Sequence, residues 1–139
     1  MKKIFIFLTT TILFISCSKE KKDSNNDAYN MMQFEHMKKS IEYNNKAIEL
    51  INSDTSLTIT QNQMNEHIEL LKKAVNEAKK VDTLVLNDIK NKFGNFYEKK
   101  YIQGIEQQIK GYETDNPTLA IKGQILYDEY IDWKAKEGL

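Results

Sequence analysis

Apolar residues recur every three or four positions through most of the chain after residue 28, which is the spacing of helices that bury one side. The first run predicts a helix over residues 27–52, and Asn44 falls on the same stripe as its apolar residues. The second run predicts a helix over residues 60–80. The two stripes are Phe34, Met37, Ile41, Ile48 and Ile51 in the first helix, and Met64, Ile68, Leu71, Val75 and Ala78 in the second.

Local signals predict where helices begin. Thr60 with Gln63 three residues later forms a capping box, in which each side chain pairs with a backbone group at the start of a helix. Asn116 followed by Pro117 joins a favoured N-cap residue to a favoured first helical residue. This pair predicts a last helix over residues 117–136.

The segment between these two starts allows two interpretations. Residues 81–83 could form a turn that caps a third helix over residues 83–113, within which Gly94 and Gly104 would mark kinks or close helix crossings. Alternatively, residues 60–112 could form one continuous helix, because the apolar stripe stays in phase through Asp82. Asp82 on the stripe and ordinary helix lengths favour the break.

The predicted fold is all-α, because no segment after residue 28 alternates apolar and polar residues for six positions. Four amphipathic helices with short loops make an antiparallel four-helix bundle over residues 28–139. Residues equidistant from the loop around Asp115 should then meet, which gathers the aromatic side chains at one end. The expected pairs are Ile109 with Ile121, Ile105 with Leu126 or Ile125, Tyr101 with Tyr130, and Tyr97 or Phe96 with Trp133. Such a cluster could be core, or it could line a groove for a partner, so the candidate binding residues are Trp133, Tyr130, Tyr101 and Tyr97.

The N-terminus has the pattern of an export signal. Lys2 and Lys3 precede residues 4–15, which carry no charge. Twelve residues span about 18 Å as a helix, whereas a bilayer core is about 30 Å thick. A positive start, a short apolar core and a small residue are typical of a secretory signal peptide.

The end of this segment, Leu13-Phe14-Ile15-Ser16-Cys17, resembles the lipobox of bacterial lipoprotein precursors, although that class prefers Leu at the position of Phe14. The resemblance implies a signal peptide over residues 1–16, cleavage before Cys17, a diacylglyceryl group on its sulfur and a fatty acid such as palmitate on its amine. Ser18, rather than Asp, implies the outer membrane of a diderm bacterium. Cys17 is the only cysteine, so no internal disulfide is possible.

Residues 17–27 are expected to be the lipidated cysteine and a flexible tether, because residues 18–27 contain no apolar side chain. The whole chain has 20 basic and 20 acidic residues, and removal of Lys2 and Lys3 leaves 18 lysines against 20 acids. A balance of this kind provides no field for attracting nucleic acid. We therefore expect the membrane, through the anchor, and an envelope protein as partners, and no nucleic acid.

Candidate catalytic chemistry is sparse. His36 and His67 lack the Glu-x-x-His spacing of di-iron bundles, and pairing of their helices would leave them offset by about 8 Å along the axis, too far for a shared metal ion. The sequence has no phosphate-binding loop or nucleophile elbow. We expect no cofactor, no metal and no enzyme activity. The prediction is a lipid-anchored, non-catalytic binding or scaffold domain, serving a protein partner, an assembly or toxin neutralisation; the alternative is a small metal- or cofactor-binding envelope enzyme or carrier.

Overall fold

The computed structural model describes residues 24–52 and 59–139, and within those ranges every regular element is a helix and no strand occurs. The all-α prediction is therefore confirmed for this part of the chain. In chain order the helices are α1 (Ser24–Asn52), α2 (Gln61–Ala78), α3 (Thr83–Ile89), α4 (Phe93–Phe96), the π-helix η1 (Tyr97–Ile102), α5 (Gln103–Glu113) and α6 (Pro117–Glu137).

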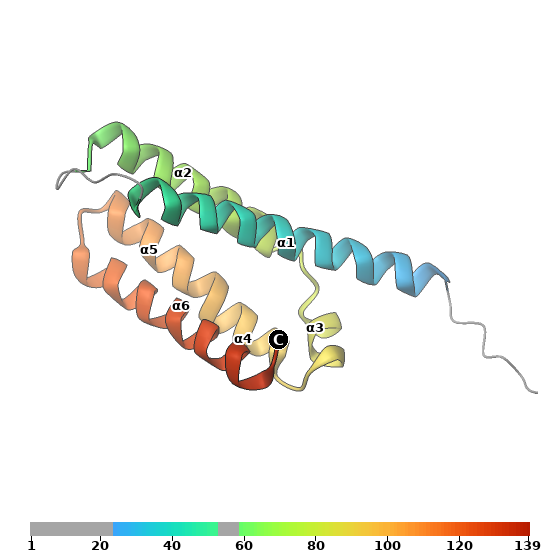
Figure 1. The fold of residues 1–139 in the computed structure, drawn as a ribbon. Coiled ribbons are helices and arrows are strands. Elements are labelled where there is room, and N and C mark those ends of the chain that lie inside the picture. The colour runs from blue at the N-terminus through green and yellow to red at the C-terminus, as the bar shows by residue number, and fades with distance from the viewer. Residues whose placement is uncertain (1–23, 53–58) are drawn as a thin grey trace, which may run out of the picture.

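The long helices associate in pairs. α1 packs along α2, and α5 packs along α6 (Figure 1). The two pairs meet where α2 faces α5, and ion pairs join them there: Lys72 to Glu113 at 3.0 Å and Lys79 to Glu106 at 2.5 Å. The first turns of α1 run on past the end of α2, on the side of the molecule where α3 lies (Figure 1).

The predicted helix starts are confirmed. Thr60 and Gln63 form a reciprocal capping box at the start of α2. The Asn116 side chain accepts a hydrogen bond from the backbone N–H of Leu119, with Pro117 in the first turn of α6. Asp82 caps α3 by accepting from the N–H of Leu84 at 2.9 Å, so α2 and α3 are separate helices.

The single helix predicted over residues 83–113 is wrong, because the chain breaks between α3 and α4. Lys92 adopts a left-handed backbone conformation with φ of 70°. The Asn87 side chain accepts a hydrogen bond from the N–H of Gly94 at 2.9 Å, which replaces a helical bond across the turn. Gly94 also lies so close to the backbone of Thr83 that no side chain would fit, so it marks a close approach at this turn.

A second close approach joins α5 to α6. A Cβ atom placed on Gly123 would lie 2.4 Å from the carbonyl oxygen of Gly104 and 2.6 Å from the backbone nitrogen of Gln108. Nearer the turn between α5 and α6, Gly111 faces Ala120 in the same manner. Of the two roles predicted for Gly104, the close crossing is therefore the one observed.

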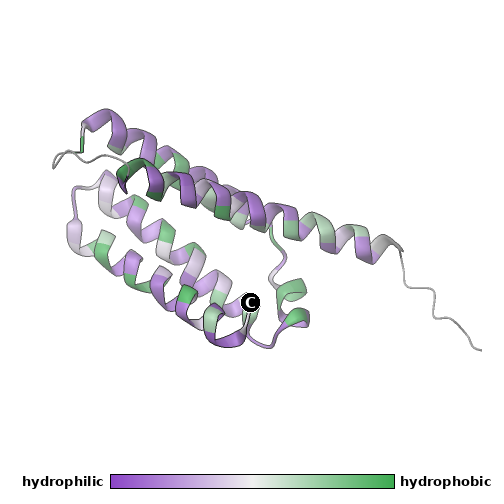
Figure 2. Cartoon of the chain, viewed as in Figure 1, coloured by the Kyte–Doolittle hydropathy of each residue, from purple (hydrophilic) through white to green (hydrophobic). Residues whose placement is uncertain are grey.

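The start and the buried side of α1 both differ from the prediction. The helix begins at Ser24, so the last residues of the predicted tether are helical. Phe34 and Ile48, predicted to face the core, are exposed, whereas Gln33, Ser40 and Asn44 are buried together with Ala47. The mixed hydropathy along α1 is visible in Figure 2. Met37 and Ile41 of the predicted stripe do pack against the core, so the prediction is wrong for Phe34 and Ile48 but not for the whole stripe.

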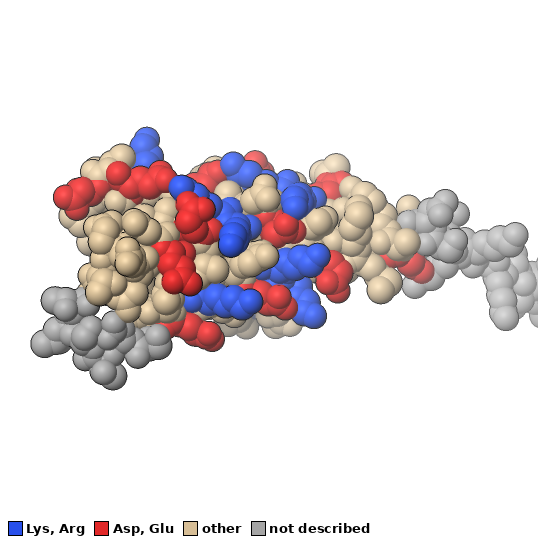
Figure 3. Space-filling model, turned by 90° about the horizontal axis from the view of Figure 1, so that it is seen from above, with Lys and Arg blue, Asp and Glu red and all other residues tan. Residues whose placement is uncertain are grey.

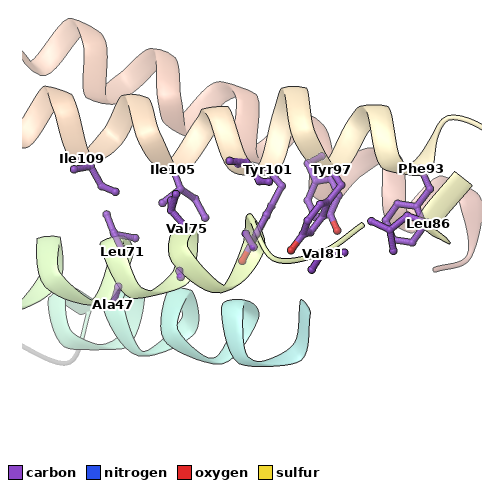
Figure 4. Packing of buried hydrophobic residues seen from close by; sticks show 14 of the residues in the cluster. Ala47, Leu71, Val75, Val81, Leu86, Phe93, Tyr97, Tyr101, Ile105 and Ile109 are labelled. Carbon is purple, nitrogen blue, oxygen red and sulfur yellow. The ribbon is translucent and has the colours of Figure 1, made fainter. Parts of the chain in front are cut away.

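The core lies between the two helix pairs and is continuous from one end to the other. In Figure 4, the labelled side chains of η1 and α5 face Ala47 and the α2 residues across the interior. Its buried apolar members are Ala47, Ile68, Leu71, Ala74, Val75, Ala78, Val81, Leu86, Phe93, Tyr97, Tyr101, Ile102, Ile105, Ile109 and Tyr130.

Candidate functional site

The predicted lipid-attachment residue, Cys17, lies outside the described residues, as does the signal peptide predicted over residues 1–16. None of the helices in residues 24–52 and 59–139 has the combination of length and hydropathy that crossing a bilayer requires. The candidate chemistry of the described part therefore rests on its aromatic cluster, its histidines and its surfaces.

Three of the four predicted aromatic residues form a compact group in the core. The Tyr97 and Tyr101 rings stack with centroids 5.1 Å apart, and Tyr130 lies 5.1 Å from Tyr101 and 6.1 Å from Tyr97. The predicted pairing of Tyr101 with Tyr130 is thus confirmed. All three side chains are at most 1% exposed, so in this structure they offer no surface to a partner.

Trp133 lies beside this group and is half-buried. Its indole stacks on Phe96 with a centroid separation of 4.6 Å, as the pairing of residues around Asp115 predicts, and it also contacts Phe93 at 5.6 Å. The same pairing predicted that Ile109 meets Ile121. Ile121 is instead 60% exposed, because the close contact of Gly111 with Ala120 places Ile121 on the outer side of α6.

The tyrosine hydroxyls differ in their partners. Ser40 donates to the carbonyl oxygen of Ala74 at 2.8 Å and lies 2.9 Å from the Tyr101 hydroxyl, which therefore donates to Ser40. Within the described residues the Tyr97 and Tyr130 hydroxyls have no hydrogen-bond partner. Ser40 is near Tyr97, but it is already committed to two bonds and gives Tyr97 none of good geometry.

Burial strongly raises the pKa of the Tyr97, Tyr101 and Tyr130 hydroxyls above the ordinary value of 10.0, chiefly because the phenolate would lose its hydration. All three rings therefore stay neutral at any physiological pH. A neutral, closed group of this kind has the character of a packed core, and it offers neither a base nor a nucleophile to a substrate.

The two histidines are far from sharing a site. His36 on α1 places Nδ1 2.7 Å from a carboxylate oxygen of Glu77 on α2. His67 is buried and donates from Nδ1 to the carbonyl oxygen of Ala47 at 2.8 Å, with its ring edge against Tyr112. In the part of the chain that the structure describes, no three His, Cys, Asp or Glu residues are grouped so that they could hold a metal ion.

The burial of His67 determines the protonation state of its imidazole. Burial lowers its pKa below the ordinary value of 6.5, and the bond to Ala47 only partly opposes that shift. The imidazole is therefore neutral near pH 7, with the proton on Nδ1, and its Nε2 has no hydrogen-bond partner among the residues that the structure describes. Its role is to hold α2 to α1. The sequence argument expected an exposed or flanking histidine, which fits His36 better than His67.

The groove between α2 and α5 has a volume of about 500 Å³, with Val75 and Ile109 among its lining residues. The Lys72–Glu113 and Lys79–Glu106 ion pairs cross between its two walls. Because these charges are paired with each other, the groove has the chemistry of a helix contact. Figure 3 shows similar interleaving of lysines and acids over the face formed by α1 and α2.

The first turns of α1 carry the most distinctive surface of the described chain. We name it the α1 apolar surface: the exposed side chains Met31, Met32 and Phe34. Met31 is 69% exposed, although a methionine ordinarily contributes to a core. In Figure 3 this end, next to the grey N-terminal residues, is mostly free of charged side chains.

This surface is held firmly to the rest of the molecule. The Tyr29 hydroxyl donates to the Asp82 carboxylate at 3.1 Å, and the Gln33 side chain accepts from the backbone N–H of Asp82 at 2.7 Å. Asp82 is also the cap of α3. The start of α1 is therefore tied to the connection between α2 and α3.

Sequence reasoning missed two of the three buried polar residues of α1, Gln33 and Ser40, although it placed the third, Asn44, on the predicted stripe. Gln33, Ser40 and Asn44 are spaced by seven and four residues and are continued by Ala47, which is as regular as the apolar stripe. A search for any residue type repeating at helical spacing would have found the second stripe, although it would not have ranked the two.

No known protein family, curated protein or solved structure matches the chain.

Proposed function

We propose that the protein is a lipid-anchored component of the cell envelope, whose helical domain acts as a non-catalytic binding or scaffold module. The anchor is Cys17, in the lipobox-like segment at residues 13–17. This assignment places the protein in the outer membrane of a diderm bacterium, exported and then held by acyl chains.

The helical domain in this proposal is an antiparallel four-helix bundle. Its four rods are α1, α2, the run of α4, η1 and α5, and α6, with α3 closing one end. The ion pairs between α2 and α5 support this arrangement because Lys72 and Lys79, seven residues apart, meet Glu113 and Glu106 in the reversed order.

The observation that carries the binding role is the distribution of chemistry between interior and surface. The aromatic residues that could have formed a reactive site are packed inside as neutral groups, whereas apolar side chains remain outside on helix faces. Ile121 and Ile125 lie one turn apart on α6 and are 60% and 51% exposed. Rigid helix faces with exposed isoleucines suit recognition of another protein.

Substitution of Cys17 tests the anchor. Cells expressing the wild-type chain or Cys17→Ala are grown with a clickable palmitate analogue, and the protein is isolated. We expect label on the wild type only, and an uncleaved precursor for the variant. Equal labelling of the two proteins would overturn the lipid-anchor assignment.

Site-specific photocrosslinking tests the binding role. A photoreactive residue at Ile125 should give a discrete crosslinked product in intact cells, and the same residue at Lys122, an exposed neighbour on α6, serves as the control. A defined product at Ile125 that is lost with Ile121→Asp supports a protein partner on this face. Identical patterns at the two positions would contradict it.

A further inference from the structure

The side chains of the α1 apolar surface cover a wide arc of the helix circumference. At 3.6 residues per turn, Phe34, Met31 and Met32 spread over an arc of about 160°. A partner helix packs against a narrower stripe, so this breadth favours a medium that reaches the helix from several directions. The rest of the circumference is used by Gln33 and Tyr29, which hold the connection to α3.

The covalent position of the surface limits what it can meet. Cys17 is seven residues before Ser24, and seven residues of fully extended chain span at most about 25 Å. Met31 lies a further seven residues along α1, about 11 Å at helical rise. The exposed methionines therefore stay within about 36 Å of the sulfur that the proposed function attaches to lipid.

Two lysines follow the α1 apolar surface along the same side of α1. Lys38 and Lys39 follow Met31 and Met32 by seven residues each, so they extend the same helix face two turns further from the anchor. Both lysines are exposed, and two exposed acids share this face: Asp27 precedes the methionines, and Glu35 lies between them and the lysines. Exposed methionines on the anchor side of two lysines with long stems suit the boundary between acyl chains and anionic head groups.

We propose that the α1 apolar surface lies in the interfacial layer of the phospholipid bilayer that holds the lipidated Cys17. The domain is then docked on the membrane by the first turns of α1, at a depth of about 5–10 Å, as well as tethered to it. This inference rests on the proposed lipid anchor. It adds a fixed orientation, with the α5–α6 turn at the end of the domain away from the membrane.

The test exploits the single cysteine. Once Cys17 is lipidated its thiol is blocked, so Met31→Cys supplies the one thiol available to an environment-sensitive dye. Ile121→Cys is the matched control, because Ile121 is similarly exposed and lies on α6 near its start. The lipidated variants are reconstituted into vesicles of equal parts phosphatidylcholine and phosphatidylglycerol, with or without brominated acyl chains.

We expect the dye at residue 31 to lose at least half of its emission in brominated vesicles, and the dye at residue 121 to lose almost none. Equal, small losses at both positions would overturn membrane docking. A dye at residue 31 that is shielded from water, unquenched by brominated lipid and close to a second label on another copy would assign the surface to self-association instead, which also overturns it. Helical circular dichroism of each variant checks the fold.

The same labelling separates failure of this inference from failure of the anchor. If Cys17 carries no lipid, each variant takes up two dyes per chain, and the proposed function fails before any quenching is measured. One dye per chain with no quenching at residue 31 leaves the anchor intact and rejects the docking.

Discussion

At the scale of single residues, the interior shows that two chemically identical groups can have opposite effects on stability. The Tyr101 hydroxyl has a partner in Ser40, whereas the Tyr97 hydroxyl, in the adjacent stacked ring, has none among the described residues. A buried hydroxyl without a partner costs about 1–3 kcal/mol, while a satisfied one contributes about 1 kcal/mol. The two tyrosines therefore form a matched pair for measurement.

Tyr97→Phe should leave the free energy of unfolding unchanged or raise it, because only an unpartnered hydroxyl is removed. Tyr101→Phe should lower it by about 1–2 kcal/mol, since Ser40 loses its donor inside the core. Urea unfolding followed by circular dichroism measures both. Equal destabilisation by the two substitutions would mean that Tyr97 has a partner, such as a buried water molecule.

The burial of His67 should make the free energy of unfolding depend on pH. Its pKa is lowered in the folded state, so the unfolded chain binds a proton more readily. The contribution of His67 is then complete above the unfolded pKa of 6.5 and is lost as the pH falls below that value toward the folded pKa. We expect the urea midpoint to fall between about pH 7 and pH 5.

His67→Gln is the control for this dependence. Glutamine can still donate to the carbonyl of Ala47 but does not titrate, so the midpoint of the variant should vary less over the same range. His36 keeps its contact with Glu77 in both proteins. An unchanged pH profile in the variant would show that another group causes the loss.

At the scale of elements, the contact of α5 with α6 depends on the absence of side chains. Gly123→Ala should destabilise the protein by about 1–3 kcal/mol, because the new Cβ meets the backbone of both Gly104 and Gln108 and no flexible side chain can move aside. Lys122→Ala, at an exposed neighbouring position, should change stability by less than about 0.5 kcal/mol. Thermal unfolding of both variants measures the difference. A melting temperature of Gly123→Ala equal to that of Lys122→Ala would contradict a tight crossing of α5 and α6.

The elements also show how far sequence reasoning reaches. Helix starts at Thr60, Asp82 and Asn116 were predictable because each depends on one side chain bonding to a nearby backbone group. The break at Lys92 was not, because it depends on the distant approach of Gly94 to Thr83 as well as on the local bond to Asn87. A helix cap depends on residues that are close together in the sequence, whereas a tertiary contact depends on residues that are far apart in it.

The same distinction between local and tertiary contacts explains which features of the candidate sites the sequence predicted. The aromatic cluster was predictable because antiparallel pairing about a short loop fixes which residues meet, and its burial in the core was one of the two interpretations that the sequence allowed. The hydrogen bonds from Ser40 and Asn44 of α1 to its tyrosines were not predictable, because they join residues far apart in the sequence. The α1 apolar surface was missed because Phe34 was assigned to the core, and only the burial of Gln33 beside it reverses that assignment.

At the scale of the whole molecule, the described part should fold without its N-terminal segment. Residues 24–139 hold the entire buried cluster, so this fragment should be strongly helical by far-ultraviolet circular dichroism and should unfold in one cooperative transition. A spectrum typical of a disordered chain would mean that folding needs the membrane or a second protein.

The proposed attachment through the start of α1 would have a mechanical consequence. Force applied at Ser24 along the axis of α1 acts parallel to its contact with α2, so the load is one of shear. Ser40 bonded to Ala74, His67 bonded to Ala47 and His36 paired with Glu77 are distributed along this contact and would share the load. A domain pulled in this direction must break these contacts together, whereas a domain pulled at right angles would lose them one turn at a time.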